Sequence, residues 1–240
     1  MRLNMMAKNR FADLLLVGLL LGIVMTVTAL WYWMLPGGHD PGILDRLEPE
    51  RICKVPLQVG KTDSNHNGVP DALDIVAGAR LEVANHTQYD GSYCSGGFPP
   101  PDKGVCSDVI WRALRAIDYD LKTEIDRDIS EVPQVYGSTG QRPDPNIDFR
   151  RVRNLKVFFQ RHGQVLTTQI KPWDVKNLVQ WQPGDIVVYA KPYEHIGIVS
   201  DKRRADGVPL LIHNGGPYAS EADVLQDWPS TLVYHFRFID

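Results

Sequence analysis

The sequence predicts an α+β domain, in which helices come first and an antiparallel sheet follows, preceded by one transmembrane helix. Three patterns support this class: an uncharged apolar run near the N-terminus, a helical repeat of apolar residues around 107–116, and short β-branched segments from Asp185 onward. Hydrophobic residues make up 43% and charged residues 23% of the 240 positions, which is ordinary for a globular protein. The net charge of −3 argues against a nucleic-acid partner.

Residues 11–35 are predicted to be a transmembrane signal anchor. The stretch from 14 to 35 carries no charge and would span roughly 30 Å as a helix, which matches the hydrocarbon core of a bilayer. Basic residues precede it and aromatic residues close its far end: Arg2, Lys8 and Arg10, then Trp31, Tyr32 and Trp33. The positive-inside rule therefore leaves residues 1–10 as a cytoplasmic tail.

A cleaved signal peptide is the alternative for this segment. The apolar run is long for a signal peptide, and bulky aromatic residues stand where small ones should precede a cleavage site. Both interpretations export the rest of the chain, so we expect a single-pass cell-membrane protein whose C-terminal domain is extracytoplasmic. About 190 residues then remain outside, enough for one domain core.

Residues 36–62 are predicted to form a linker, and residues 63–74 resemble a calcium loop. Side-chain oxygens fall at loop positions 1, 3, 5, 9 and 12, and Gly68 occupies position 6, where an EF-hand loop turns sharply. The predicted ligands are Asp63, Asn65, Asn67, Val69, Asp71 and Asp74. We expect a structural Ca²⁺ held with modest affinity and no cofactor for catalysis; a metal-free linker rich in Asn and Gly is the alternative.

The three cysteines are expected to divide into a pair and a single thiol, because thiols outside the cytoplasm tend to form disulfides. Cys106 directly precedes an amphipathic run over 107–116, which places it at a helix N-terminus. The helix dipole and free amides there favour a thiolate and lower the pKa of the thiol. Cys53 and Cys94 lie in loop-like sequence and are candidates for a disulfide. A small buried residue without chemistry is the alternative for Cys106.

His195 stands out among the seven histidines. It begins a short β-branched segment, 195–200, which follows a similar segment at 185–190 across a loop containing proline. A titratable residue in an apolar strand is either a satisfied core histidine or a site residue. The next predicted strand ends with His213 and Asn214, and since neighbouring strand residues face opposite ways, only one of them can point towards His195.

This order of cysteine, histidine and polar residue resembles the NlpC-type papain-like cysteine peptidases, which cut bacterial cell-wall peptides. The similar stretches are Tyr93-x-x-Gly96-Gly97, Cys106-Ser107, Gly184-Asp185-Ile186-Val187, His195-Ile196-Gly197-Ile198 and Ile212-His213. The sequence is still more similar to the bacterial family called domain of unknown function 1287, through the segments 104–113, 143–159, 183–187, 195–203 and 212–216. The resemblance covers about 74–238 and implies a papain-like catalytic domain over 75–240.

The resemblance implies a cysteine hydrolase, either a peptidase or an amidase, that acts on cell-wall peptides. Cys106 would be the nucleophile and His195 the base, with His213 as the third member and Asn214 as its alternative. Residues expected to hold the oxyanion or the substrate are Ser107, Tyr89, Tyr93, Arg150 and Arg151. Asp108 departs from the family pattern, which has glycine there, and its charge opposes thiolate formation unless it is paired or points away.

Two other functions fit the same residues. One is acyl transfer or transpeptidation through the same triad, which differs from hydrolysis in the acceptor. The other is a wall-binding module whose site is inactive, which the reactivity of Cys106 would distinguish. The oligomeric state is not encoded in any pattern of this sequence.

Overall fold

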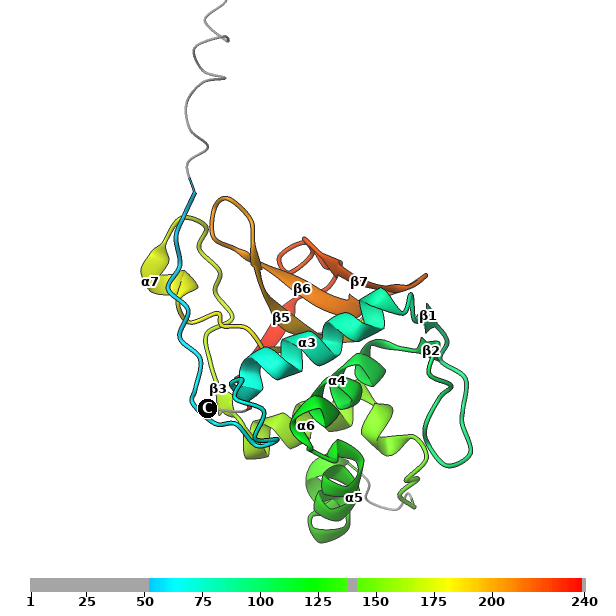
Figure 1. Cartoon of the computed structure of the whole chain (residues 1–240). Helices are drawn as coiled ribbons and strands as arrows, with labels where there is room; N and C mark the ends of the chain where they lie inside the picture. The colour runs from blue at the N-terminus through cyan, green and yellow to red at the C-terminus, as the bar shows by residue number, and fades with distance from the viewer. Residues whose placement is uncertain (1–51, 138–141, 239–240) are drawn as a thin grey trace, which may run out of the picture. The chain divides into compact units, whose positions relative to one another are not determined.

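The computed structural model describes residues 52–137 and 142–238 (Figure 1). The predicted cytoplasmic tail, the transmembrane anchor and residues 36–51 of the linker lie outside these residues. Within the described ranges, no helix has the length and apolar character needed to cross a bilayer. The described residues belong to one compact unit, and this unit carries the candidate site.

Six strands form one antiparallel sheet in the order β3-β8-β4-β5-β6-β7. Their bounds are β3 Gln164–Val165, β4 Ile186–Tyr189, β5 His195–Arg203, β6 Pro209–Asn214, β7 Ala219–Ala222 and β8 Leu232–Arg237. The antiparallel sheet predicted from Asp185 onward is therefore confirmed, with short β3 as an addition from earlier in the chain. The last strand, β8, returns to lie between β3 and β4.

The longer helices precede most of the sheet and cover one of its faces (Figure 1), whereas a four-residue helix packs through Leu178 against the opposite face. Their bounds are α3 Asp71–Ala84, α4 Cys106–Leu114, α5 Leu121–Glu131, α6 Val152–His162 and α7 Val175–Leu178, with 3₁₀ turns at Arg115–Ile117, Pro133–Tyr136 and Asp148–Arg150. α3 and α4 pack closely because α3 contains Gly78, where an added Cβ would approach the Ala113 backbone to 3.1 Å. A short parallel pair, β1 (Gln88–Tyr89) and β2 (Lys103–Gly104), leads into α4.

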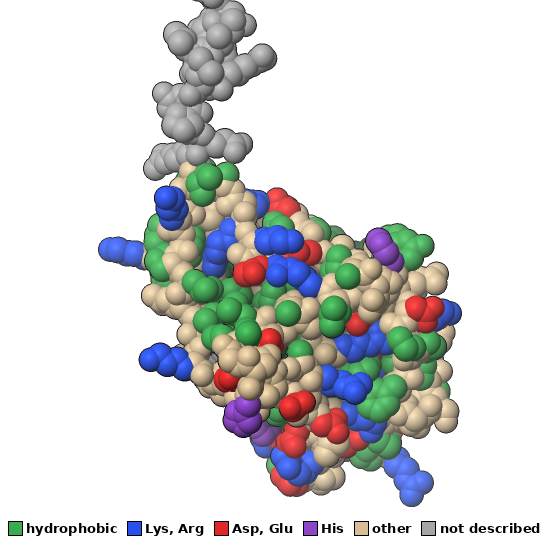
Figure 2. Space-filling model, viewed as in Figure 1, with side chains coloured by type: hydrophobic (Ala, Val, Ile, Leu, Met, Phe, Trp, Pro, Cys, Tyr) green, Lys and Arg blue, Asp and Glu red, His purple; other side chains and the backbone are tan. Residues whose placement is uncertain are grey.

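Both faces of the sheet are covered, which explains why β4 is apolar at every position. Ile186 and Val188 pack into the core under the helices, whereas Val187 and Tyr189 pack into a second cluster on the opposite face with Trp181. A strand buried on both sides has no polar alternation. On the face shown in Figure 2, positive and negative side chains are interspersed.

The calcium-like loop is ordered by its own hydrogen bonds. Asp63 accepts the backbone amides of Asn67 and Gly68 at 3.0 and 2.9 Å, and Asp74 accepts from the side-chain amides of Asn65 and Asn67 at 2.9 Å each. Asp71 turns to Ser64 instead.

Helix α3 begins at Asp71, so the last four residues of the calcium-like loop form its first turn. Among the described residues, no group of three or more His, Cys, Asp or Glu is arranged to hold a metal. Calcium binding, with Val69 and the asparagines as further ligands, stays a prediction.

The predicted disulfide between Cys53 and Cys94 is not formed, and both thiols are free. Cys53 donates its amide to Ala205 at 2.7 Å and packs beside Gly207 at the β5–β6 hairpin. Cys94 belongs to the loop before β2, where its thiol lies 3.6 Å from the Ser92 carbonyl. Each cysteine is thus held by its own neighbours in a different part of the domain.

Candidate active site

Cys106 is the first residue of α4, as predicted. The helix begins there because the Asp108 carboxylate turns back to accept the amide of Val105 at 2.7 Å, which caps the first turn. The backbone amides of Ile196, at the start of β5, and of Ser107 lie near the sulfur of Cys106 and favour its thiolate. The nucleophile candidate is therefore fixed between the helix terminus and the strand that carries His195.

Burial raises the pKa of the Cys106 thiol to about 11. The negative charge of Asp108 acts in the same direction, whereas the amides of Ile196 and Ser107 oppose it. The expectation that the helix terminus would lower this pKa is therefore wrong, because the cost of desolvating the thiolate exceeds the stabilisation from the amides. Cys106 rests as a neutral thiol at pH 7.

His195 and His213 form a hydrogen-bonded pair across neighbouring strands β5 and β6. Nε2 of His195 lies 2.8 Å from Nδ1 of His213, and the rings are perpendicular. Nε2 of His213 in turn lies 3.4 Å from the hydroxyl of Ser220 on β7. The pair uses Nε2 of His195, which leaves Nδ1 as the ring nitrogen for proton transfer.

The imidazoles are shielded from water. The indole of Trp228, from the loop between β7 and β8, stacks on His195 with 3.8 Å between ring centroids and 13° between planes. Trp228 is held there by donating its Nε1–H to the Tyr193 carbonyl at 3.0 Å. Burial lowers the pKa of His195 to about 3 and that of His213 to about 4, so both are neutral at pH 7.

Asn214, the alternative third member, faces away from His195. Its side-chain amide donates to the Thr87 and Gly104 carbonyls at 3.1 and 3.2 Å. It thereby ties β6 to the segments that lead into α4. Strand alternation allowed only one of the two residues to meet His195, and the structure selects His213.

Asp108 is paired, which answers the objection that its charge raised against the nucleophile. Arg150 binds it with Nε and Nη2 at 2.8 and 2.9 Å, and both side chains are almost fully buried. Asp108 also accepts the indole N–H of Trp111 at 2.8 Å. The guanidinium of Arg150 binds Asp108 and also donates to the Ser92 carbonyl. It is therefore not free to bind a substrate carboxylate, contrary to the expectation from the sequence.

A cavity of about 510 Å³ opens beside Cys106. Three of the predicted substrate residues, Tyr89, Arg150 and Arg151, line it; Arg151 also pairs with Asp148 at 2.6 Å. Burial, reinforced by the negative charge of nearby Asp108, raises the pKa of Tyr89, which keeps its hydroxyl protonated.

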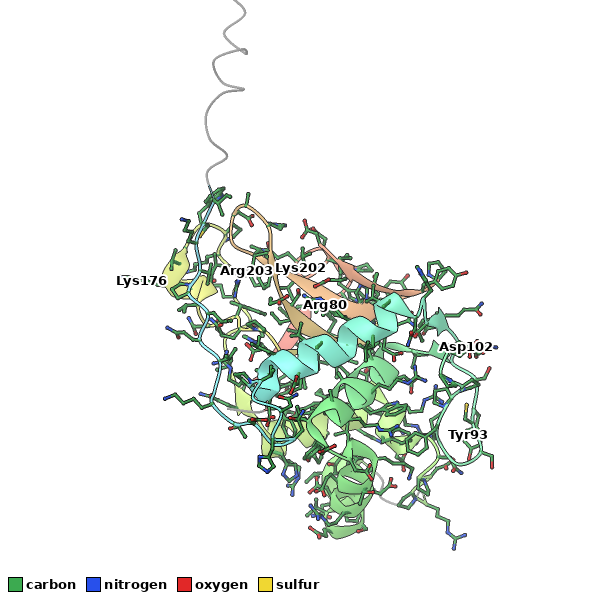
Figure 3. All side chains as sticks on the ribbon, viewed as in Figure 1. Arg80, Tyr93, Asp102, Lys176, Lys202 and Arg203 are labelled. Carbon is green, nitrogen blue, oxygen red and sulfur yellow. The ribbon has the colours of Figure 1, made fainter. Side chains whose placement is uncertain are left out.

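Two other predicted residues do not reach this cavity through their side chains. Tyr93 projects from the outer loop (Figure 3), where its hydroxyl accepts from Asn146 at 2.8 Å. The Ser107 side chain is buried, and its hydroxyl has no hydrogen-bond partner among the residues that the structure describes. Ser107 therefore contributes to the site through its backbone amide.

The sequence model of the family described as "Domain of unknown function (DUF1287)" matches residues 76–238. The chain belongs to this family. It is also 40% identical over 194 residues to "Uncharacterized protein YijF" of Escherichia coli (strain K12), covering 77% of this chain and 87% of that protein. Among solved structures, "Structure of NlpC2 from Trichomonas vaginalis" is similar at a TM-score of 0.40 and 14% identity, over 75% of this chain and 51% of that one.

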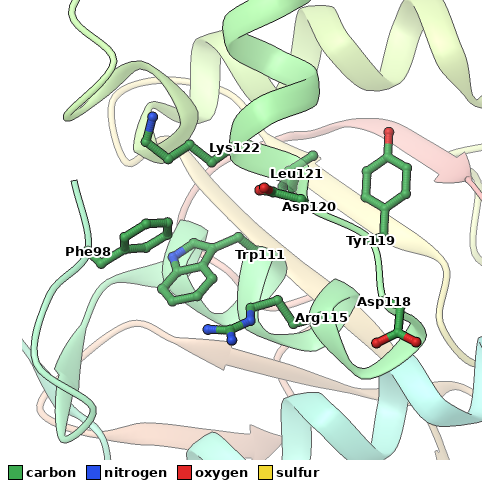
Figure 4. Close-up of a pocket in the computed structure, with 8 residues that line it drawn as sticks. All are labelled: Phe98, Trp111, Arg115, Asp118, Tyr119, Asp120, Leu121 and Lys122. Carbon is green, nitrogen blue, oxygen red and sulfur yellow. The ribbon is translucent and has the colours of Figure 1, made fainter. Parts of the chain in front are cut away.

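The DUF1287 domain has another cavity, of about 410 Å³, beside the other end of α4 (Figure 4). It shares no lining residue with the cavity at Cys106. Its charged lining residues balance in sign: Arg115 and Lys122 against Asp118 and Asp120. No cysteine or histidine lines this cavity, so it lacks the nucleophile and base found at Cys106.

Sequence reasoning missed Trp228 and Ser220 in the DUF1287 site. Trp228 lies in an irregular loop with no periodic signal. Ser220 is on a short, partly exposed strand, where a serine is unremarkable. Pairing of β7 with β6 is what brings Ser220 opposite His213, and no local pattern encodes that pairing.

Proposed function

We propose that this protein is a cysteine hydrolase, a peptidase or amidase, that cleaves cell-wall peptides outside the cytoplasm while anchored through residues 11–35. The 2.8 Å hydrogen bond between His195 and His213 is the observation that carries the proposal. It orients an otherwise costly buried imidazole beside the strand residue whose amide contacts Cys106. A buried histidine pair next to a cavity-lining thiol serves proton transfer better than it serves packing.

Catalysis begins from the neutral thiol and neutral imidazole. Nδ1 of His195 takes the proton of Cys106 as the sulfur attacks the carbonyl carbon of the scissile amide. Nε2–H of His195 donates to Nδ1 of His213, whose own Nε2–H faces the Ser220 hydroxyl. This tautomer chain keeps Nδ1 of His195 free to accept.

The tetrahedral intermediate carries a negative oxygen that needs hydrogen-bond donors. The free amides at the start of α4 and the protonated hydroxyl of Tyr89, which lines the same cavity as Cys106, can supply these donors. His195 then returns the proton to the departing amine, leaving a thioester on Cys106. Water, deprotonated by His195, attacks the thioester, releases the carboxylic acid and restores the thiol.

The test is digestion of purified bacterial wall peptides by the full-length protein, with products identified by mass spectrometry. Cys106→Ala is expected to abolish cleavage with an unchanged melting temperature, while Cys53→Ala, which removes a free thiol remote from the site, retains it. Cleavage by Cys106→Ala would refute the proposal. An added amine acceptor decides between water and transpeptidation, because acyl transfer would yield amine-linked products.

A further inference from the structure

A second cavity, of about 440 Å³, adjoins the one at Cys106. Val152, Arg153 and Glu194 line both cavities, so the two meet at these residues. The second cavity extends away from the sulfur between α6 and the strands β4 and β8. A substrate bound at Cys106 can therefore extend into it.

Three cations line this second cavity, which we call the cationic pocket: Arg153, Lys156 and Lys191. Arg153 and Lys156 are three residues apart on α6 and so project from one side of the helix, while Lys191 lies in the β4–β5 turn. They face a single lining carboxylate, that of Glu194.

The three cations are unpaired, unlike the arginines around them. None of them forms an ion pair within residues 52–137 and 142–238, whereas Arg150 and Arg151 pair with Asp108 and Asp148. Like charges that share one concave wall repel each other and concentrate a positive potential in the cavity. A bound anion relieves that repulsion, and it does so without breaking an existing ion pair.

The uncharged residues that line the cationic pocket indicate what else the ligand should carry besides a negative charge. Val188, Val233 and Tyr234 supply apolar surface from β4 and β8, so the pocket suits a short side chain or backbone segment that ends in an anion. We propose that the cationic pocket binds a free carboxylate of the substrate, and that the enzyme selects peptides carrying that carboxylate near the scissile bond. This inference rests on the proposed function for its substrate and on the unpaired charges for its chemistry.

The first test compares alkylation of Cys106 by iodoacetate, an anion, and by iodoacetamide, its neutral analogue. The ratio of the two rates at one pH cancels the thiolate fraction and reports the local potential. A unit charge about 10 Å away changes such a rate roughly twofold in water, so Arg153→Gln/Lys156→Gln is expected to lower the ratio about fourfold at low salt. An unchanged ratio overturns the proposal.

The matched control is Lys61→Gln/Lys176→Gln, which removes the same charge from exposed positions outside both cavities; Lys176 is labelled on α7 in Figure 3. Its ratio should stay at the wild-type value. If the control lowers the ratio equally, the effect belongs to net charge and the pocket is refuted. Peptide mass spectrometry isolates Cys106 from the free Cys53 and Cys94.

The second test needs no reactivity and separates this inference from the proposed function. Full-length Cys106→Ala is titrated calorimetrically with Ac-Ala-Glu-Ala and with Ac-Ala-Gln-Ala-amide. We expect at least about fivefold tighter binding of the acidic peptide, lost in Arg153→Gln/Lys156→Gln. Equal affinities, or no binding of the acidic peptide, overturn the inference. Failure of both reagents to alkylate Cys106 would instead remove the hydrolase proposal, with this titration still deciding the pocket.

Discussion

Replacing Arg150 by glutamine is expected to lower the free energy of unfolding by about 3–5 kcal/mol, the cost of breaking one partner from a buried ion pair. The side chains of Arg150 and Asp108 are only 3% and 1% exposed. Water therefore cannot replace the lost hydrogen bonds to Asp108, as it would at the surface. The change removes two charged hydrogen bonds of 2.8 and 2.9 Å to Asp108 and a third, of 3.1 Å, to the Ser92 carbonyl. It also leaves the Asp108 charge uncompensated within one turn of Cys106.

Two assays measure these consequences. Chemical denaturation gives the free energy of unfolding, and the pH dependence of iodoacetamide alkylation at Cys106 gives the pKa of the thiol, which should rise further in Arg150→Gln. The control is Arg127→Gln, since Arg127 is 60% exposed and pairs with Glu124 on the surface of α5, where loss of the pair costs at most about 1 kcal/mol.

A double-variant cycle completes the argument. Asp108→Asn/Arg150→Gln should be more stable than the sum of the single changes predicts, because the second change removes the charge that the first left unpaired. A loss below about 1 kcal/mol for Arg150→Gln, strict additivity in the cycle, or an unmoved thiol pKa would each refute the reasoning.

Three further predictions concern other parts of the domain. The free energy of unfolding should rise with pH between about 4 and 6.5, by at most about 1.4 kcal/mol per pH unit for each histidine. In this range histidines of the unfolded chain bind protons, whereas buried His195 and His213, with pKa values of about 3 and 4, do not. Denaturation measured across this range should give a shallower slope for His213→Gln. Trp228→Ala should raise the pKa of His195 by admitting water to the ring, and an unshifted NMR titration would contradict the shielding role. Millimolar calcium should raise the melting temperature of the wild type but not of Asp63→Ala, and equal responses would reject the metal loop.

Local patterns were sufficient for the parts of the site that depend on neighbours in the chain. The apolar repeat after Cys106 located the start of α4, and the alternation of strand residues reduced the partner of His195 to His213 or Asn214. Both inferences use geometry that a helix or a strand imposes whatever surrounds it. The pattern of the calcium-like loop gave no sign that its last turn, from Asp71, is already part of α3.

The parts that failed depend on which segments meet in three dimensions. The Asp108–Arg150 pair joins residues 42 positions apart, and neither residue carries a local sign of the other. The raised pKa of Cys106 arises from the packing around the sulfur, which a helix-terminus argument omits. Cys53 and Cys94 were paired by counting, whereas their distances are set by the β5–β6 hairpin and the loop before β2.

The position of β8 between β3 and β4 has a consequence for how the protein matures. The ribosome completes α4 well before β8, so the edge of β4 that pairs with β8 stays open until nearly the whole domain has been made. The sulfur of Cys106 is covered only when β5, which carries Ile196, packs against α4; before that its thiol has the acidity of an ordinary cysteine, with a pKa near 8.5. The nascent chain is therefore the form most open to oxidation or to mispairing among its three cysteines, and packing of β5 against α4 ends that exposure.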